Sequence, residues 1–100
     1  FTLTTTVDTG AGFTGKDGSD TYTSVTGTTG LQTLTAGDNL NGGLGADTLN
    51  ITNTVAATLG AGVIATSIET VNVTATAATT IDTTGFATQV GCAWTLICWV

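Results

Sequence analysis

A nine-residue pattern is the feature of this sequence that most restricts its fold. Residues 42–50 read GGLGADTLN and match G-G-x-G-x-D-x-U-x at every defined position, where U is a large apolar residue. Residues 33–41, 24–32 and 15–23 follow the same phase less completely. The units share an apolar column (Tyr22, Leu31, Leu40, Leu49), a glycine column (Gly18, Gly27, Ala36, Gly45) and an acidic column (Asp20, Thr29, Asp38, Asp47). Four units in one phase predict short strands separated by glycine-rich turns.

The rest of the chain carries the composition of strands. Thr, Val and Ile are abundant, and their β-branched side chains suit a pleated strand better than a helix. In residues 51–90 short apolar strings recur between Thr and Asn, and residues 71–74 alternate as a half-buried strand does. We therefore expect an all-β chain of short strands, with residues 51–90 adding further coils to a parallel solenoid.

The repeat spacing predicts which residues stack. If six residues of each unit form the turn and three form the strand, two units make one coil of eighteen residues. Asp20 and Asp38 would then face the same gap between coils, while Asp47 would lie on the opposite side over Thr29. The apolar column is expected to form the interior ladder of these coils, because solenoids bury such columns.

At this point the sequence resembles a known family. The phrases FTLTTTVD (residues 1–8), GKDGSDTYT (15–23), LTAGDNLNGGLGADTLNIT (34–52) and ATSIETVNVT (65–74) are similar to bacterial surface-layer proteins that carry the calcium-binding nonapeptides of repeats-in-toxin (RTX) proteins. The resemblance implies a right-handed parallel β-roll or β-solenoid over residues 1–90, with the nonapeptides at about 15–50 and further short strands at 51–90.

Calcium is the cofactor that this resemblance implies. The chain has seven acidic residues against one basic residue, and Ca²⁺ prefers oxygen ligands. By resemblance, the turns 15–20 and 33–38 would share one site, and the turn 42–47 would use a poorer partner at 24–29. The residues expected to hold the metal are Asp17, Asp20, Asp38, Asp47, Gly15, Gly18, Gly42 and Gly45. The alternative is that these residues only form the turns of a metal-free β-solenoid.

Several function classes fit the composition poorly. The chain has no His, and Lys16 is its only basic residue, so no base is available to activate a nucleophile and we expect no enzyme activity. A net charge of −6 disfavours nucleic acid as a partner, and no run of about twenty apolar residues predicts a membrane span. The missing initiating Met and leader indicate a piece of a larger or processed protein.

The expected function is therefore structural. We expect a module of a calcium-stabilised surface-layer or secreted surface protein that self-assembles outside the bacterial cell, after export by a leaderless type I route as in the resembling families. Expected partners are further copies, neighbouring modules of the same protein, and as a candidate a cell-surface polysaccharide. The alternatives are an RTX-type C-terminal secretion or folding domain of a hydrolase or adhesin, or a Thr-rich solenoid that binds ice or polysaccharide.

Residues 91–100 differ from the rest by composition. Both Trp residues and both cysteines, Cys92 and Cys98, lie in this atypical hydrophobic tail. Two cysteines so close together do not form the disulfide framework of a small secreted domain. A terminal strand that caps the stack, a segment foreign to the native protein, an oligomer interface and part of a secretion signal are all compatible with this tail.

Overall fold

The computed structural model describes residues 1–27, 31–82, 85–86 and 91–94, the last four as backbone only. Within them lie eight strands and one 3-10 helix, so the all-β expectation is confirmed. The elements in chain order are η1 (Gly10–Phe13), β1 (Thr21–Thr26), β2 (Asn39–Asn41), β3 (Thr48–Asn53), β4 (Ala57–Leu59), β5 (Ile64–Thr66), β6 (Thr70–Ala75), β7 (Thr79–Ile81) and β8 (Gly91–Trp94).

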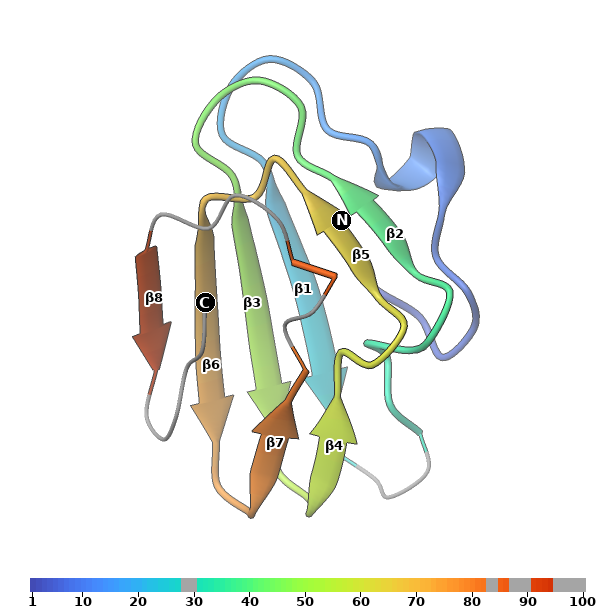
Figure 1. Cartoon of the computed structure of the whole chain (residues 1–100), viewed down its shortest axis with the longest axis vertical. Coiled ribbons are helices and arrows are strands. Elements are labelled where there is room, and N and C mark those ends of the chain that lie inside the picture. Colours follow the sequence, from blue (N-terminus) through green and yellow to red (C-terminus); the bar gives the residue numbers. More distant parts are fainter. Residues whose placement is uncertain (28–30, 83–84, 87–90, 95–100) are drawn as a thin grey trace.

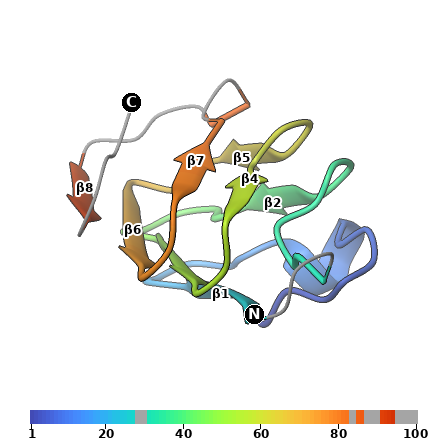
Figure 2. The same ribbon diagram turned by 90° about the horizontal axis from the view of Figure 1, so that it is seen from below.

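All strand pairs are parallel, and they form three sheets. The largest sheet has the order β1-β3-β6-β8, and the pairs β2-β5 and β4-β7 form the other two. After β3 the chain passes through β4 and β5 before it returns to the largest sheet as β6, beside β3 (Figure 1). Seen from below, β6, β7 and β5 follow one another around a shared interior (Figure 2). Each circuit therefore has three sides.

The third side makes each circuit longer than the eighteen residues predicted from the repeat. Asp20 meets Asp47, 27 residues further on, and Asn50 meets Asn72 after 22 residues. The first of these circuits spans three nine-residue units instead of two. The predicted coil length is therefore wrong, because the spacing of the units gives no information about how many of them complete one turn of the chain.

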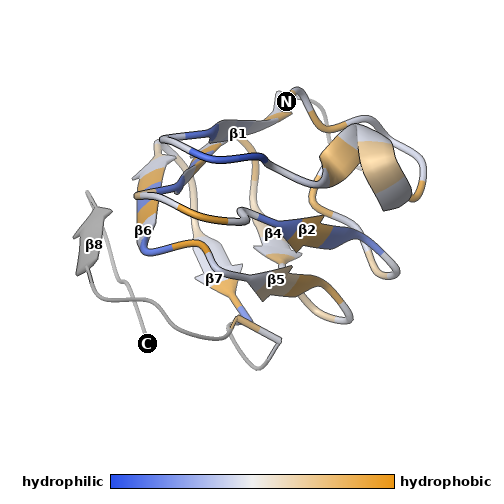
Figure 3. Cartoon of the chain, turned by 90° about the horizontal axis from the view of Figure 1, so that it is seen from above, coloured by the Kyte–Doolittle hydropathy of each residue, from blue (hydrophilic) through white to orange (hydrophobic). Residues whose placement is uncertain are grey.

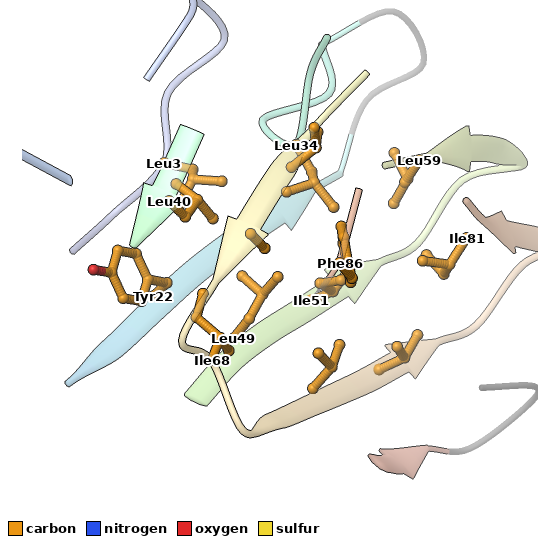
Figure 4. Packing of buried hydrophobic residues seen from close by; sticks show 14 residues of the cluster. Leu3, Tyr22, Leu34, Leu40, Leu49, Ile51, Leu59, Ile68, Ile81 and Phe86 are labelled. Atoms are coloured by element: carbon orange, nitrogen blue, oxygen red, sulfur yellow. The ribbon is translucent and has the colours of Figure 1, made fainter. Parts of the chain in front are cut away.

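The core is built from side chains that alternate inward along each strand. In β3 every second residue is buried, and its partners in β1 and β6 continue the same columns. Tyr22, Leu49 and Val71 form one column, and Leu40 pairs with Ala65 from the β2-β5 sheet (Figure 4). Burying each large aliphatic side chain contributes about 1.5–3 kcal/mol, so these columns hold the sheets together.

The predicted apolar column is correct at three of its four positions. Tyr22, Leu40 and Leu49 are completely buried, whereas Leu31 is 55% exposed. Leu31 lies in the connection between β1 and β2, outside any strand, so no alternation turns its side chain inward. Its prediction as an interior residue is wrong because the strand residues of its unit belong to β1, which ends at Thr26 before Leu31 is reached.

Tyr22 also anchors the first circuit through its hydroxyl. The hydroxyl donates to the carbonyl oxygen of Asn41 at 2.6 Å and lies 3.2 Å from that of Phe13. The ring stacks on Phe1 with a centroid distance of 4.6 Å. Burial raises the pKa of Tyr22 to about 12, and the nearby charges of Asp20 and Asp47 act in the same direction.

This raised pKa predicts how the fold responds to alkali. The neutral phenol is favoured in the folded chain, so its contribution is complete below pH 10 and is lost as the pH rises from 10 through about 12. Tyr22→Phe should lower the free energy of unfolding at neutral pH by about 1 kcal/mol and flatten this alkaline decline. Urea unfolding across pH tests it, and tyrosinate absorbance reports Tyr22 alone because it is the only tyrosine. An ordinary pKa would contradict the prediction.

Candidate metal centre in the stacked acidic turns

Two glycine-rich turns of the same pattern lie directly on each other. Residues 15–20 (GKDGSD) and 42–47 (GGLGAD) both read G-x-x-G-x-D and both lead into strands of the largest sheet. Backbone hydrogen bonds join them from Gly18 N–H to Leu44 O at 2.9 Å and from Leu44 N–H to Lys16 O at 3.2 Å. The turns therefore continue the parallel ladder of β1 and β3 beyond the strands themselves.

Glycine is required in these turns because the backbones approach too closely for a side chain. A Cβ atom at Gly15 would meet the carbonyl oxygen of Gly42, and one at Gly42 would meet that of Ser67. Gly45 has a φ of 121°, which L-residues rarely adopt, and a Cβ there would meet the carbonyl oxygen of Gly18. The repeated glycines are thus explained by stacking.

Carboxylates link successive circuits in two columns. In the first acidic ladder, Asp20 N–H donates to Asp47 Oδ1 at 2.7 Å, and Asp47 N–H donates to Glu69 Oε2 at 2.8 Å. In the second acidic ladder, Asp8 N–H donates to Asp38 Oδ1 at 2.9 Å. Asp8, Asp38 and Asp47 are buried, so these hydrogen bonds are shielded from water.

The second carboxylate oxygen usually closes its own turn. Asp20 Oδ2 accepts Lys16 N–H at 2.9 Å, and Asp38 Oδ2 accepts Thr35 N–H at 2.8 Å. Asp8 Oδ2 accepts Thr4 N–H at 2.7 Å in the same way. All three aspartates therefore close their own turn with Oδ2, as residues that favour turns commonly do, and Asp38 also accepts the amide of Asp8 with Oδ1.

Asp47 differs from these three aspartates because its Oδ2 atom does not close its own turn. The amide that would correspond to that of Lys16 belongs to Gly43, and it donates to Asn41 Oδ1 at 3.0 Å instead. Asp47 Oδ2 is consequently buried without a hydrogen-bond partner among the described residues. A buried, unpaired carboxylate oxygen costs free energy unless a cation or proton satisfies it. Asp47 Oδ2 is therefore the one buried carboxylate oxygen of the described ladders that remains free to bind a cation.

The structure brings together part of the predicted metal-site residues. Gly15, Gly18, Gly42 and Gly45 all lie in the two stacked turns, and Asp20 lies over Asp47. The predicted pairing of Asp20 with Asp38 is wrong, because Asp38 belongs to the second acidic ladder. Asp17 is exposed, and its backbone bridges to Leu44 at the turn tip. Thr29, the predicted partner of Asp47, lies outside the described residues.

Two members of the acidic ladders, Asp8 and Glu69, do not follow the nine-residue pattern. Asp8 lies 30 residues before Asp38, and Glu69 lies 22 residues after Asp47. Neither separation is a multiple of nine, so the repeat phase cannot find them. The usable signal is local: an acidic residue shortly before a strand of alternating apolar residues, as in the segment 68–73 (IETVNV). Within the described part, no three carboxylate, His or Cys side chains gather closely enough to hold a metal.

Two further predictions concern a membrane span and the C-terminal tail. No helix among the described residues has the length and apolar character needed to cross a lipid bilayer. In the tail, residues 91–94 form β8 beside β6, whereas the side chain of Cys92 and all of Cys98 lie outside what the structure describes. Comparison with protein-family models, with curated proteins and with solved structures finds no match to this chain.

Proposed function

We propose that this chain is a structural module of a calcium-stabilised surface-layer or secreted surface protein, built as a right-handed parallel β-solenoid that assembles outside the bacterial cell. The observation that carries the proposal is the in-register stack of the turns 15–20 and 42–47, joined by the first acidic ladder. A stack of this kind gives a stiff element that neighbouring modules can extend.

Two further features support a structural role over a catalytic one. The chain has no His and a single basic residue, and its buried aspartates accept backbone amides instead of converging on a cleft. Among the described residues β8 pairs only with β6, and an edge strand of this kind can offer its amides and carbonyls to another chain, which favours association with further modules.

Asp47 is the residue that would bind calcium in this proposal. The orphan Oδ2 atom fits a hard cation, and the carbonyl oxygen of Ser67 lies beside it, since a Cβ atom at Gly42 would meet both oxygens. Bound calcium would supply positive charge to a chain of net charge −6. Because the turns exist only in the folded chain, ion binding would contribute directly to folding, and calcium outside the cell would favour folding there.

The calcium response of Asp47→Asn tests this proposal. In the wild-type chain, calcium at about a hundredfold excess over its dissociation constant should raise the melting temperature by roughly 10 °C. Asp47→Asn removes the buried charge, so it should melt at the wild-type temperature or higher in chelator and show no rise with calcium. Circular dichroism melting with chelator and with millimolar calcium measures both.

Asp82→Asn is the matched control, because Asp82 follows β7, lies outside both ladders and is not among the residues expected to hold the metal. It should keep the wild-type calcium response. Sedimentation velocity on the same samples should show larger species for the wild type with calcium than with chelator. A wild-type chain with identical melting and sedimentation in both conditions would remove calcium and calcium-dependent assembly from the proposal.

A further inference from the structure

The outer face of the largest sheet carries an ordered set of neutral polar side chains. In β1, β3 and β6 the residues that alternate with the core point outward, and nearly all are Thr or Asn. Figure 3 shows polar and apolar positions alternating along β6. The threonine–asparagine face consists of three rows across the strands, namely Thr21-Thr48-Thr70, Thr23-Asn50-Asn72 and Val25-Thr52-Thr74.

The register makes this face regular in two directions. Partners in a row lie in adjacent parallel strands, about 4.8 Å apart, and neighbouring rows are two residues apart, or about 6.6 Å. Asn72 Nδ2 donates to Asn50 Oδ1 at 2.8 Å and fixes both amides in the central row. The strand separation is close to the length of one pyranose ring in an extended polysaccharide, so each strand could meet one sugar.

The polar groups on this face are available to a ligand. Within the described residues, the hydroxyls of Thr48, Thr52, Thr70 and Thr74 have no protein hydrogen-bond partner, and Thr74 and Thr21 are exposed. Hydroxyls and amides both donate and accept, which suits the hydroxyl groups of a sugar. The side chains are held by the sheet, so little conformational entropy is lost when they bind.

The lack of charged residues on this face indicates which class of ligand it can bind. β1, β3 and β6 contain no Asp, Glu, Lys or Arg, although the chain has a net charge of −6. The acidic side chains of the first ladder lie in the turns that precede β1, β3 and β6, and those of the second ladder lie outside these strands. An uncharged face beside acidic turns matches a neutral partner and disfavours an anionic one.

We propose that the threonine–asparagine face binds an extended neutral polysaccharide that runs across the strands, with one sugar over each strand of β1, β3 and β6. The binding uses hydrogen bonds from the threonine hydroxyls and the Asn50–Asn72 pair. It does not depend on the calcium proposal, since no ladder carboxylate lies on this face.

Affinity electrophoresis of the full chain in native gels tests this proposal. The probes are hydroxyethyl cellulose and dextran as neutral glucans and alginate as an anionic one. The wild-type chain should be retarded by at least one neutral glucan and not by alginate. Thr52→Lys, in the middle strand of the face, should weaken that binding roughly tenfold. Thr74→Lys, at an exposed position, gives the same test if Thr52→Lys fails to fold by circular dichroism.

Thr58→Lys is the matched control, because Thr58 is an exposed strand residue in β4 and the substitution changes the charge equally. It should bind as the wild type does. Equal binding by the face variants and the control would overturn the proposal, as would the absence of retardation by both neutral glucans. In that second case, faceting of ice crystals by the wild-type chain would assign the face to ice instead.

Discussion

Gly42→Ala is expected to unfold the chain or to lower its free energy of unfolding by about 3 kcal/mol or more. The added methyl group would meet the carbonyl oxygen of Ser67 and the carboxylate of Asp47. Neither neighbour can yield cheaply, because the Ser67 oxygen is backbone and Asp47 is buried in the first acidic ladder. Since a domain of this size has a total stability of about 5–15 kcal/mol, the loss is a large fraction of it.

Gly12→Ala is the control for this substitution. A Cβ atom at Gly12 meets nothing within 4 Å, and its φ is not in the left-handed region. The change should therefore alter stability by less than about 1 kcal/mol, with a slight gain from the restricted unfolded chain. Urea unfolding followed by circular dichroism compares the two variants. Equal stability of both would show that the turn 42–47 does not pack against Ser67 as described.

Leu49→Ala is expected to destabilise the fold by about 2–5 kcal/mol, because it opens a cavity in the centre of the core. Leu49 is completely buried, and its neighbours in the column are Tyr22 and Val71. All three belong to the rigid parallel sheet, so the surrounding side chains cannot collapse far into the space. The midpoint of urea unfolding should fall accordingly.

Leu31→Ala provides the comparison within the same nine-residue phase. Leu31 is 55% exposed, so the same chemical change should cost less than about 0.5 kcal/mol. The nine-residue pattern places Leu31 and Leu49 in the same apolar column. Comparing the two variants therefore tests whether both positions are buried or only Leu49. If Leu31→Ala were as costly as Leu49→Ala, the connection between β1 and β2 would have to be packed inside the core.

The nine-residue pattern predicts the strands at Tyr22, Leu40 and Leu49 and the glycines of the turns before β1 and β3, because these features depend on neighbouring residues. Gly15, Gly18, Gly42 and Gly45 are all required locally by close backbone approach or by positive φ, as their spacing indicated. The strand alternation around Val71 and Val73 likewise reports burial directly.

The stacking partners could not be predicted from the same pattern. Which aspartates meet depends on the length of a whole circuit, and the circuit from Asp20 to Asp47 includes the long connection between β1 and β2, whose path the nonapeptide spacing does not indicate. Asp20 therefore meets Asp47 instead of Asp38. The orphan oxygen of Asp47 was equally invisible, since it depends on Asn41 taking the amide of Gly43.

The carboxylate links of the two acidic ladders all run in one direction. In each link, the amide belongs to the earlier circuit and the carboxylate to the later one, as in Asp8 to Asp38 and Asp20 to Asp47. A chain that emerges from the ribosome with its amino end first thus exposes amides whose acceptors have not yet been synthesised. Each new circuit supplies the carboxylates that accept the amides of the circuit before it. The hydrogen bonds of the ladders would therefore form one circuit behind the synthesis of the chain.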